Sequence, residues 1–294
     1  MHLNPLLIAN KKIIQDNYLD FNYLSRGLQH ADGYFTSFRL KDFMIADYDN
    51  HKNRLKESAV VFGFSSCVDF DELIQVMIDS MQKNTFSEIS KTTTFWCKLL
   101  FWRQNGTAYQ LKEWNESPVQ TLIIVKPDCD TESSDPILLT SVQICRIPDK
   151  SMSCNVKWLN GANSIQAQIE ATQKGGNLAL MPSVNGWISD TANSCVAWIN
   201  EDAIHTPSHN CDALLGTTIR SFYDFCKSHS IPINFVEQHI DSINPKVEWL
   251  LFNARNGCFQ IDCFQNQKIT YSKFSTDLMN EFNQWRWSHA KKVY

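Results

Sequence analysis

Short stretches in which hydrophobic and polar residues alternate, or in which apolar residues run together, recur along the whole chain. Alternation with a period of two is typical of strands that have one buried face. The pattern predicts strands at residues 6–8, 12–14, 34–40, 44–46, 96–102, 120–125, 137–140, 178–181, 187–188, 195–200, 203–205, 249–252 and 259–263. Asp-Gly at 32–33 and Asn-Gly at 185–186 favour tight chain reversals between strands.

A second set of segments has apolar residues three and four positions apart, as one face of a helix does. This spacing predicts helices from residue 50 onward and at residues 71–82, 164–174, 218–226 and 278–287. In the second of these, the inward-facing residues are expected to be Leu73, Val76, Met77 and Met81. Because helices and strands are interleaved along the chain, the fold class is expected to be mixed α/β (α+β).

The chain is expected to form two domains. Polar residues 113–118 end in a proline, and this composition predicts a boundary between an N-terminal α/β domain of residues 1–117 and a C-terminal domain of residues 118–294. Residues 127–136, which are rich in Asp, Ser and Thr, are a second boundary candidate. We interpret them as a loop, since residues 120–125 and 137–140 are expected to be strands of one sheet.

The composition excludes several classes of protein. The 294 residues are 43% hydrophobic and 20% charged, which is typical of a globular protein with a sizeable core. The net charge of -4 argues against a nucleic-acid-binding surface. No apolar run approaches the ~20 residues that cross a membrane. The N-terminus lacks the features of a signal peptide, so we expect a cytoplasmic protein.

The cysteines and histidines do not predict a metal site or a disulfide framework. None of the ten cysteines forms a Cys-x-x-Cys pair or a Cys/His cluster with zinc spacing. They are typical of buried thiols in a reducing compartment. His205 and His209 are four residues apart, but Pro207 between them excludes a regular helix.

A lysine and an aspartate are the first candidates for chemistry. Lys157 lies between Val156 and Trp158, and a dry setting lowers the pKa of a lysine toward that of a neutral amine. The alternative is an exposed lysine on an edge strand. Asp190 follows residues 187–189, where a strand is expected to end, and can accept a hydrogen bond from a protonated ring nitrogen. Its alternative role is that of a turn aspartate.

The third candidate is an anion-binding turn, Gly-Thr-Thr at 216–218, which precedes a predicted helix. Arg54, on the helix that begins near residue 50, could add a positive charge. The alternatives are an ordinary threonine cap and a solvent-facing arginine. An amine, a carboxylate and a phosphate site together are what pyridoxal phosphate requires. The motifs of nucleotide-binding loops, hydrolase nucleophiles and zinc proteases do not occur.

Six segments extend this pattern and occur in one order along the chain. They are residues 26–39, 51–55 (His-Lys-Asn-Arg-Leu), 157–160 (Lys-Trp-Leu-Asn), 186–198, 216–218 and 251–257 (Leu-Phe-Asn-Ala-Arg-Asn-Gly). In these segments the chain resembles the class IV aminotransferases, the fold-type-IV pyridoxal phosphate enzymes. The resemblance implies a two-domain, D-amino acid aminotransferase-like fold whose C-terminal domain binds the cofactor. It also implies a homodimer and a small-molecule amino substrate.

The resemblance assigns roles to individual residues. It implies that Lys157 is the catalytic lysine that bonds to the cofactor, and that Thr36 lies near the leaving group. Further cofactor contacts are implied for Arg54, Asp190, Ser194, Thr217 and Thr218. Substrate contacts are implied for Arg103, Tyr109, Asn253 and Arg255.

The chain departs from the family pattern at several of these positions. The family has glutamate where Asp190 stands, and usually asparagine where Cys195 stands. One arginine of the family's substrate loop is Thr107, for which Arg39 or Arg255 is the candidate replacement. Aminotransferase members usually carry glutamate where Thr36 stands, whereas lyase members carry Phe-Thr-Thr, close to Phe-Thr-Ser at 35–37.

These motifs give one leading hypothesis and two alternatives. The leading hypothesis is a lyase resembling 4-amino-4-deoxychorismate lyase, which releases pyruvate and 4-aminobenzoate for folate synthesis. The first alternative is a class IV aminotransferase that acts on D- or branched-chain amino acids. The second is a non-catalytic family member, for which the changes at Asp190, Cys195 and Thr107 are the motive.

Overall fold

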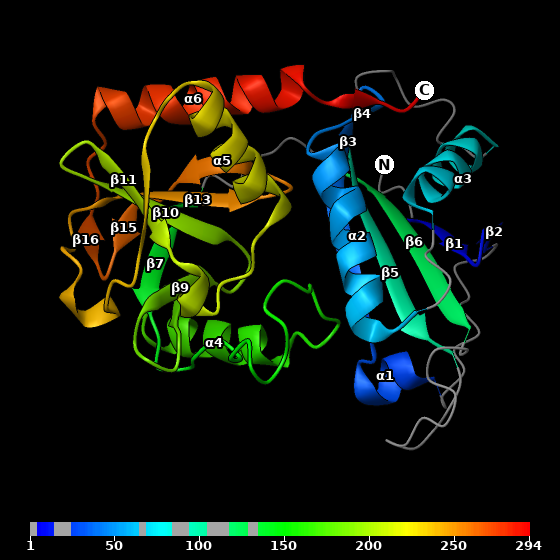
Figure 1. Cartoon of the computed structure of the whole chain (residues 1–294), viewed down its shortest axis with the longest axis horizontal. Coiled ribbons are helices and arrows are strands. Elements are labelled where there is room, and N and C mark those ends of the chain that lie inside the picture. Colours follow the sequence, from blue (N-terminus) through cyan, green and yellow to red (C-terminus); the bar gives the residue numbers. More distant parts are fainter. Residues whose placement is uncertain (1–4, 15–24, 65–68, 84–93, 105–117, 129–134) are drawn as a thin grey trace. The chain divides into compact units, whose positions relative to one another are not determined.

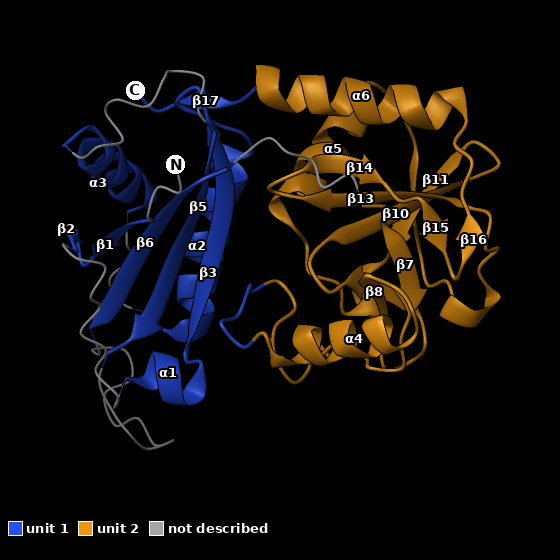
Figure 2. Ribbon diagram, turned by 180° about the vertical axis from the view of Figure 1, so that it is seen from behind, with its two compact units in different colours: residues 1–130, 156–160, 289–294 blue, residues 131–155, 161–288 orange. Residues whose placement is uncertain are grey.

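The computed structural model describes residues 5–14, 25–64, 69–83, 94–104, 118–128 and 135–294. The chain divides into two compact units. The first contains residues 1–130, 156–160 and 289–294, and the second contains residues 131–155 and 161–288 (Figure 2). Among the described residues, no helix is both long and apolar enough to cross a membrane.

In its described residues, the first unit is a seven-stranded sheet with three helices (Figure 1). The strand order is β17-β4-β3-β5-β6-β1-β2. The strands are β1 (Leu6–Ala9), β2 (Lys12–Ile13), β3 (Gly33–Lys41), β4 (Met44–Ile45), β5 (Thr94–Arg103), β6 (Val119–Pro127) and β17 (Lys291–Lys292). The helices are α1 (Arg26–His30), α2 (Tyr48–Phe62) and α3 (Phe70–Lys83).

One face of this sheet packs against α2 and α3. The Tyr34 ring lies 5.2 Å from Phe62 of α2, and the Phe38 ring lies 6.2 Å from Phe70 of α3. Alternate residues of β5 are buried in this core and half-exposed on the other face. In α3 the predicted inward face is confirmed, because Leu73, Met77 and Met81 are buried and Val76 packs against the same core.

The second unit has two five-stranded sheets, ordered β12-β11-β10-β13-β14 and β16-β15-β7-β8-β9. The strands are β7 (Leu138–Ser141), β8 (Leu178–Pro182), β9 (Ile188–Thr191), β10 (Cys195–Asn200), β11 (Ala203–Pro207), β12 (Ile233–Val236), β13 (Glu248–Asn253), β14 (Gly257–Gln260), β15 (Cys263–Phe264) and β16 (Gln267–Lys268). The helices are α4 (Ala162–Gln173), α5 (Thr217–Ser228) and α6 (Lys273–Ser288). One core, which includes Trp198, Trp249 and Phe264, joins residues of both sheets.

Two sequence predictions about strand pairing are wrong. Strands β6 and β7 were expected to share a sheet, but β6 pairs with β5 and β1, whereas β7 pairs with β8 and β15. The predicted strand 259–263 is two strands, β14 and β15, which belong to different sheets. The period of a strand reveals its buried face but carries no information about its partner.

The pairing of β6 also determines where the first unit ends. The unit extends to Asp130 rather than to residue 117, since β6 lies between β5 and β1. Two later segments of the chain, Val156–Asn160 and His289–Tyr294, also belong to this unit. The first of these two segments contains Lys157.

Candidate cofactor site

Lys157 lies on a short segment that extends the sheet of the first unit at the edge of β3. The Phe35 N–H donates to the Lys157 carbonyl at 2.9 Å, and the Leu159 N–H donates to the Gly33 carbonyl at 2.9 Å. Tyr34 and Trp158 form an antiparallel bridge between these two contacts. A Cβ on Gly33 would lie 2.2 Å from the Phe101 carbonyl oxygen of β5 and 2.7 Å from Leu159 Cδ1. The close packing of Gly33 against both neighbours therefore requires glycine.

The side chain of Lys157 lies on the sheet face opposite α2. Trp158 points to the α2 side, where its ring lies 4.6 Å from that of Phe62. Neighbouring residues of an extended segment point to opposite faces. Accordingly, the Lys157 Nζ lies 5.2 Å from the centroid of the Phe35 ring, on the other face. The amine therefore has an aromatic neighbour within its own unit.

A second lysine, which the sequence analysis missed, shares that aromatic ring. The Lys98 Nζ lies 4.2 Å from the centroid of Phe35, and burial lowers the pKa of Lys98, with a further contribution from Lys126. Within the described ranges Lys98 forms no ion pair with a carboxylate. The alternating pattern of residues 96–102 predicts that Lys98 lies on the sheet face opposite the core. The pattern does not predict that Lys98 lies close to Lys157.

Thr36 and Arg54 lie on the α2 side of the sheet. The Thr36 hydroxyl lies 2.7 Å from His51 Nδ1, and both side chains are fully buried. Arg54 follows His51 by three residues on the buried face of α2. Thr36 and Phe35 point to opposite faces of β3. The structure thus brings Thr36 to His51 and places its hydroxyl on the opposite face from the Lys157 amine.

Two of the arginines that were candidates for substrate binding, Arg103 and Arg39, are paired with carboxylates of the same unit. Arg103 donates from Nε to Asp32 at 3.1 Å and from an Nη to the Phe62 carbonyl at 2.7 Å. Arg26 binds the same Asp32 oxygen at 2.5 Å. Arg39 pairs with Asp128 at 3.1 Å. Tyr109 and Thr107 lie outside the described residues.

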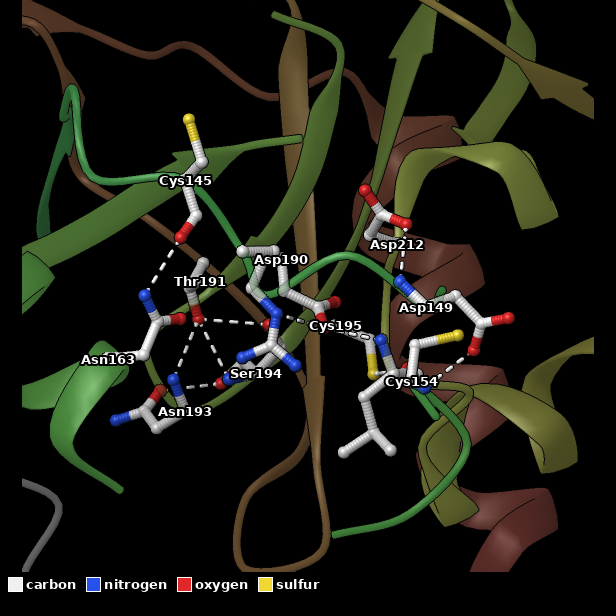
Figure 3. A network of polar contacts seen from close by, with 12 residues as sticks. Cys145, Asp149, Cys154, Asn163, Asp190, Thr191, Asn193, Ser194, Cys195 and Asp212 are labelled. Atoms are coloured by element: carbon white, nitrogen blue, oxygen red, sulfur yellow. Dashed lines mark hydrogen bonds and ion pairs between the residues drawn. The ribbon is translucent and has the colours of Figure 1, made fainter. Parts of the chain in front are cut away.

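In the second unit, Asp190 lies inside β9. The sequence pattern had predicted that it follows the end of the strand. Its side chain is buried, and its Oδ2 accepts a hydrogen bond from the Leu214 N–H at 2.7 Å (Figure 3). The Arg146 Nε lies 3.8 Å from the same oxygen. This setting combines a backbone donor with a nearby positive charge.

Ser194 and Asn253 are brought together beside the turn that links β9 to β10. The Ser194 N–H donates to the Thr191 hydroxyl at 2.8 Å, which closes the turn. The Asn253 side-chain amide donates to the Ser194 hydroxyl at 3.0 Å. Arg255, two residues after Asn253, is exposed.

The N-terminus of α5 suits an anion. Gly216 is the cap residue and has no side chain that could make a capping hydrogen bond. The first turn has no acidic residue. Thr217 and Thr218 are both buried. A Cβ on Gly216 would lie 2.6 Å from the Cys195 Sγ, so alanine here would require that thiol to shift. Backbone N–H groups and the helix dipole at such a terminus attract a phosphate. The residues present therefore fit the phosphate and ring nitrogen of the implied cofactor.

Comparison with known proteins agrees with this geometry. The family model described as "Amino-transferase class IV" matches residues 33–262. A protein of Methanocaldococcus jannaschii, described as a putative branched-chain-amino-acid aminotransferase, is 22% identical over 232 residues, which are 77% of this chain and 76% of that protein.

Solved structures of this kind cover nearly the whole chain. The branched-chain amino acid aminotransferase of Escherichia coli has a TM-score of 0.86 at 16% identity, covering 98% of this chain and 99% of its own. The enzyme of Thermobaculum terrenum, in its pyridoxal phosphate form, has a TM-score of 0.83 at 15% identity and covers 98% of each chain. At these identities the likeness concerns the fold. The expected mixed α/β, fold-type-IV architecture is confirmed.

Proposed function

Because the chain belongs to the class IV amino-transferase family, we propose that it is a pyridoxal phosphate-dependent aminotransferase that acts on amino acids with branched or other apolar side chains. The relative in M. jannaschii, whose description names branched-chain amino acids, supports this substrate class. The cofactor supplies an electron sink for the bonds of the amino-bearing carbon.

The roles of the chain's own residues follow from their chemistry. Lys157 offers the amine that bonds to the cofactor and afterwards moves a proton at the α-carbon of the substrate. Asp190 keeps the ring nitrogen protonated. Thr217 and Thr218 at the N-terminus of α5 are the proposed phosphate ligands of the second unit, and Arg54 is a proposed phosphate ligand of the first. These assignments are proposals, supported by the burial of Asp190, Arg54 and both threonines.

One observation favours an aminotransferase for apolar amino acids over the lyase. The lyase substrate brings two carboxylates, and Arg103, Arg39 and Arg255 were candidates to bind them. The guanidinium groups of the two that belong to the first unit are held by carboxylates of that unit, Arg103 by Asp32 and Arg39 by Asp128. Lys98 is the half-buried cation beside Lys157 that has no such partner among the described residues. We propose that Lys98 binds the single carboxylate of the substrate.

The test is a half-reaction with each candidate amino acid alone. Purified holoenzyme should convert from its lysine-bound form to the pyridoxamine form when L-leucine, L-isoleucine or L-valine is added, as followed by absorbance. One equivalent of the corresponding keto acid should appear. The Lys157→Ala variant is the control. If D-alanine but none of these three L-amino acids converts the enzyme, the substrates are D-amino acids instead. If no amino acid converts it, transamination is rejected.

The second candidate function is a lyase resembling 4-amino-4-deoxychorismate lyase. It is favoured by the sequence Phe-Thr-Ser at 35–37, which resembles the Phe-Thr-Thr of lyase members. Such an enzyme would release pyruvate and 4-aminobenzoate from aminodeoxychorismate. Pyruvate release by the wild type at a level no higher than that of Lys157→Ala would eliminate this candidate.

We also propose that the protein is a cytoplasmic homodimer. None of the described cysteines forms a disulfide, which fits a reducing compartment. Light scattering coupled to size-exclusion chromatography measures the molar mass directly. A mass near that of one chain of 33.9 kDa would contradict the dimer.

A further inference from the structure

The peptide groups of Leu214 are held on both sides by side chains of neighbouring strands. The Leu214 N–H donates to Asp190 Oδ2 at 2.7 Å, and the Leu214 carbonyl accepts from the Cys195 Sγ at 3.0 Å. Asp190 belongs to β9 and Cys195 begins β10, and both lie in the network of Figure 3. We call this pair of contacts the Leu214 clamp.

The two side chains of the Leu214 clamp come from different strands and meet at one residue, Leu214, which lies 24 positions after Asp190 and 19 positions after Cys195. Both Asp190 and Cys195 are buried, and a buried hydrogen bond is costly to break. The two side chains therefore hold Leu214 as a single structural arrangement.

The Leu214 clamp acts next to the anion-binding turn. Leu214 precedes the cap residue Gly216 by two positions. The Cys195 Sγ also packs against Gly216, since a Cβ there would lie 2.6 Å from it. The thiol therefore contacts the turn twice, through the Leu214 carbonyl and against Gly216. A shift of Cys195 would move the start of α5, where Thr217 and Thr218 lie.

We propose that Cys195 is a positioning residue for the cofactor phosphate. Through the Leu214 clamp it holds the turn that leads to Thr217, while Asp190 holds the preceding peptide group through the Leu214 N–H. This inference rests on the proposed function, because it takes the phosphate of pyridoxal phosphate as the ligand of that turn. A hydroxyl at position 195 would keep a donor, whereas a methyl would remove it.

The test compares pyridoxal phosphate with pyridoxal, which lacks the phosphate, on full-length apoprotein by equilibrium dialysis. For Cys195→Ala we expect the affinity for pyridoxal phosphate to fall by roughly five- to tenfold, the effect of losing one net hydrogen bond. The affinity for pyridoxal should stay within about twofold. Cys195→Ser should retain most of the preference for the phosphorylated cofactor.

The matched control is Cys226→Ala, which removes another buried thiol of the same unit. Cys226 lies on α5, and its thiol makes no hydrogen bond to a described residue. This control should leave the ratio of the two affinities unchanged. If Cys195→Ala lowers both affinities equally, as a general loss of packing would, the inference is overturned.

A second variant keeps the inference testable if Cys195→Ala does not fold. Gly216 has φ -62° and ψ 154°, a conformation that alanine also adopts, so Sγ is the nearest obstacle to a Cβ. Gly216→Ala should weaken pyridoxal phosphate binding, and Cys195→Ser, with its shorter side chain, should recover part of that loss. Additive effects of the two changes would overturn the inference. A wild type that binds neither cofactor would instead overturn the proposed function.

Discussion

At the scale of single residues, the pairing of charges separates groups that are available to a ligand from groups that are not. Arg103 was predicted to bind the substrate, yet Asp32 and the Phe62 carbonyl hold it in place. Lys98 lacks a carboxylate partner among the described residues and shares the Phe35 ring with Lys157. A substrate carboxylate could therefore neutralise its charge.

Replacing Lys98 by glutamine should raise the KM for the amino acid by about tenfold, the effect of losing one charge-assisted hydrogen bond, with a smaller change in kcat. An anion stabilises the protonated ammonium, and burial lowers the pKa of Lys98. Substrate affinity should therefore be highest below that pKa and fall as the pH rises through it. Initial rates over a pH series measure this fall, the alkaline limb of the pH profile. The alkaline limb should be absent in Lys98→Gln.

The matched control for Lys98 is Lys126→Gln. Lys126 lowers the pKa of Lys98 through charge repulsion, so its removal should move the alkaline limb to higher pH with little change in KM at neutral pH. An unchanged KM in Lys98→Gln, with the limb retained, would show that another group binds the carboxylate.

Asp190→Asn should separate the two roles of this side chain. The amide oxygen can still accept from the Leu214 N–H, but the negative charge is lost. We expect apoprotein stability to stay close to that of the wild type, and kcat to fall by about a hundredfold or more, as on removal of other preorganised electrostatic groups. Thermal unfolding and single-turnover rates measure the two effects. If Asp190→Asn keeps the wild-type kcat, Asp190 does not have the proposed role at the ring nitrogen of the cofactor.

At the scale of helices and strands, Asp71 joins α2, α3 and β17 of the first unit. It accepts from the Tyr48 hydroxyl and from the Lys52 ammonium, each at 2.5 Å, and the Lys291 Nζ lies 3.7 Å away. The Lys52 contact, followed by the Tyr48 contact, lowers the pKa of Asp71 to about 2. The carboxylate thus stabilises the fold above its ordinary pKa of 3.8, and this contribution is lost as the pH falls toward 2.

Asp71→Asn should accordingly lower the melting temperature at pH 7, and the difference from the wild type should shrink as the pH falls below 4. Thermal unfolding across this range gives the comparison. Asp79→Asn on the same helix is the control, since among the described residues Asp79 accepts only from Gln75 of its own helix. An equal loss in both variants, independent of pH, would contradict a link between elements through Asp71.

Local patterns predicted most elements of this fold, because a period of two or 3.6 is written into neighbouring residues. The inward face of α3 is an example. Strand partners could not be predicted, and β6 and β7 were assigned to one sheet although they lie in different ones. The same limit applies to the site. Lys157 and Asp190 stood out locally, whereas the Asp32 partner of Arg103 lies 71 residues away and the Lys98 contact depends on the pairing of β3 with β5.

At the scale of the whole molecule, the proposed cofactor residues are divided between the two units. Lys157, Arg54 and Lys98 belong to the first unit, and Asp190, Thr217 and Thr218 belong to the second. The chain passes from one unit to the other after residues 130, 155, 160 and 288. Lys157 thus lies on a five-residue segment of the first unit that is flanked on both sides by the second. Its role depends on the pairing of that segment with β3.

The covalent attachment of the cofactor tests this role most directly. Holoenzyme is reduced with borohydride, which fixes the cofactor to its lysine, then digested and mapped by mass spectrometry. The predicted result is a pyridoxyl phosphate group on Lys157 at close to one per chain, and no such group in Lys157→Ala. A group on Lys98, the other lysine beside Phe35, or no modified lysine at all, would contradict the central role of Lys157.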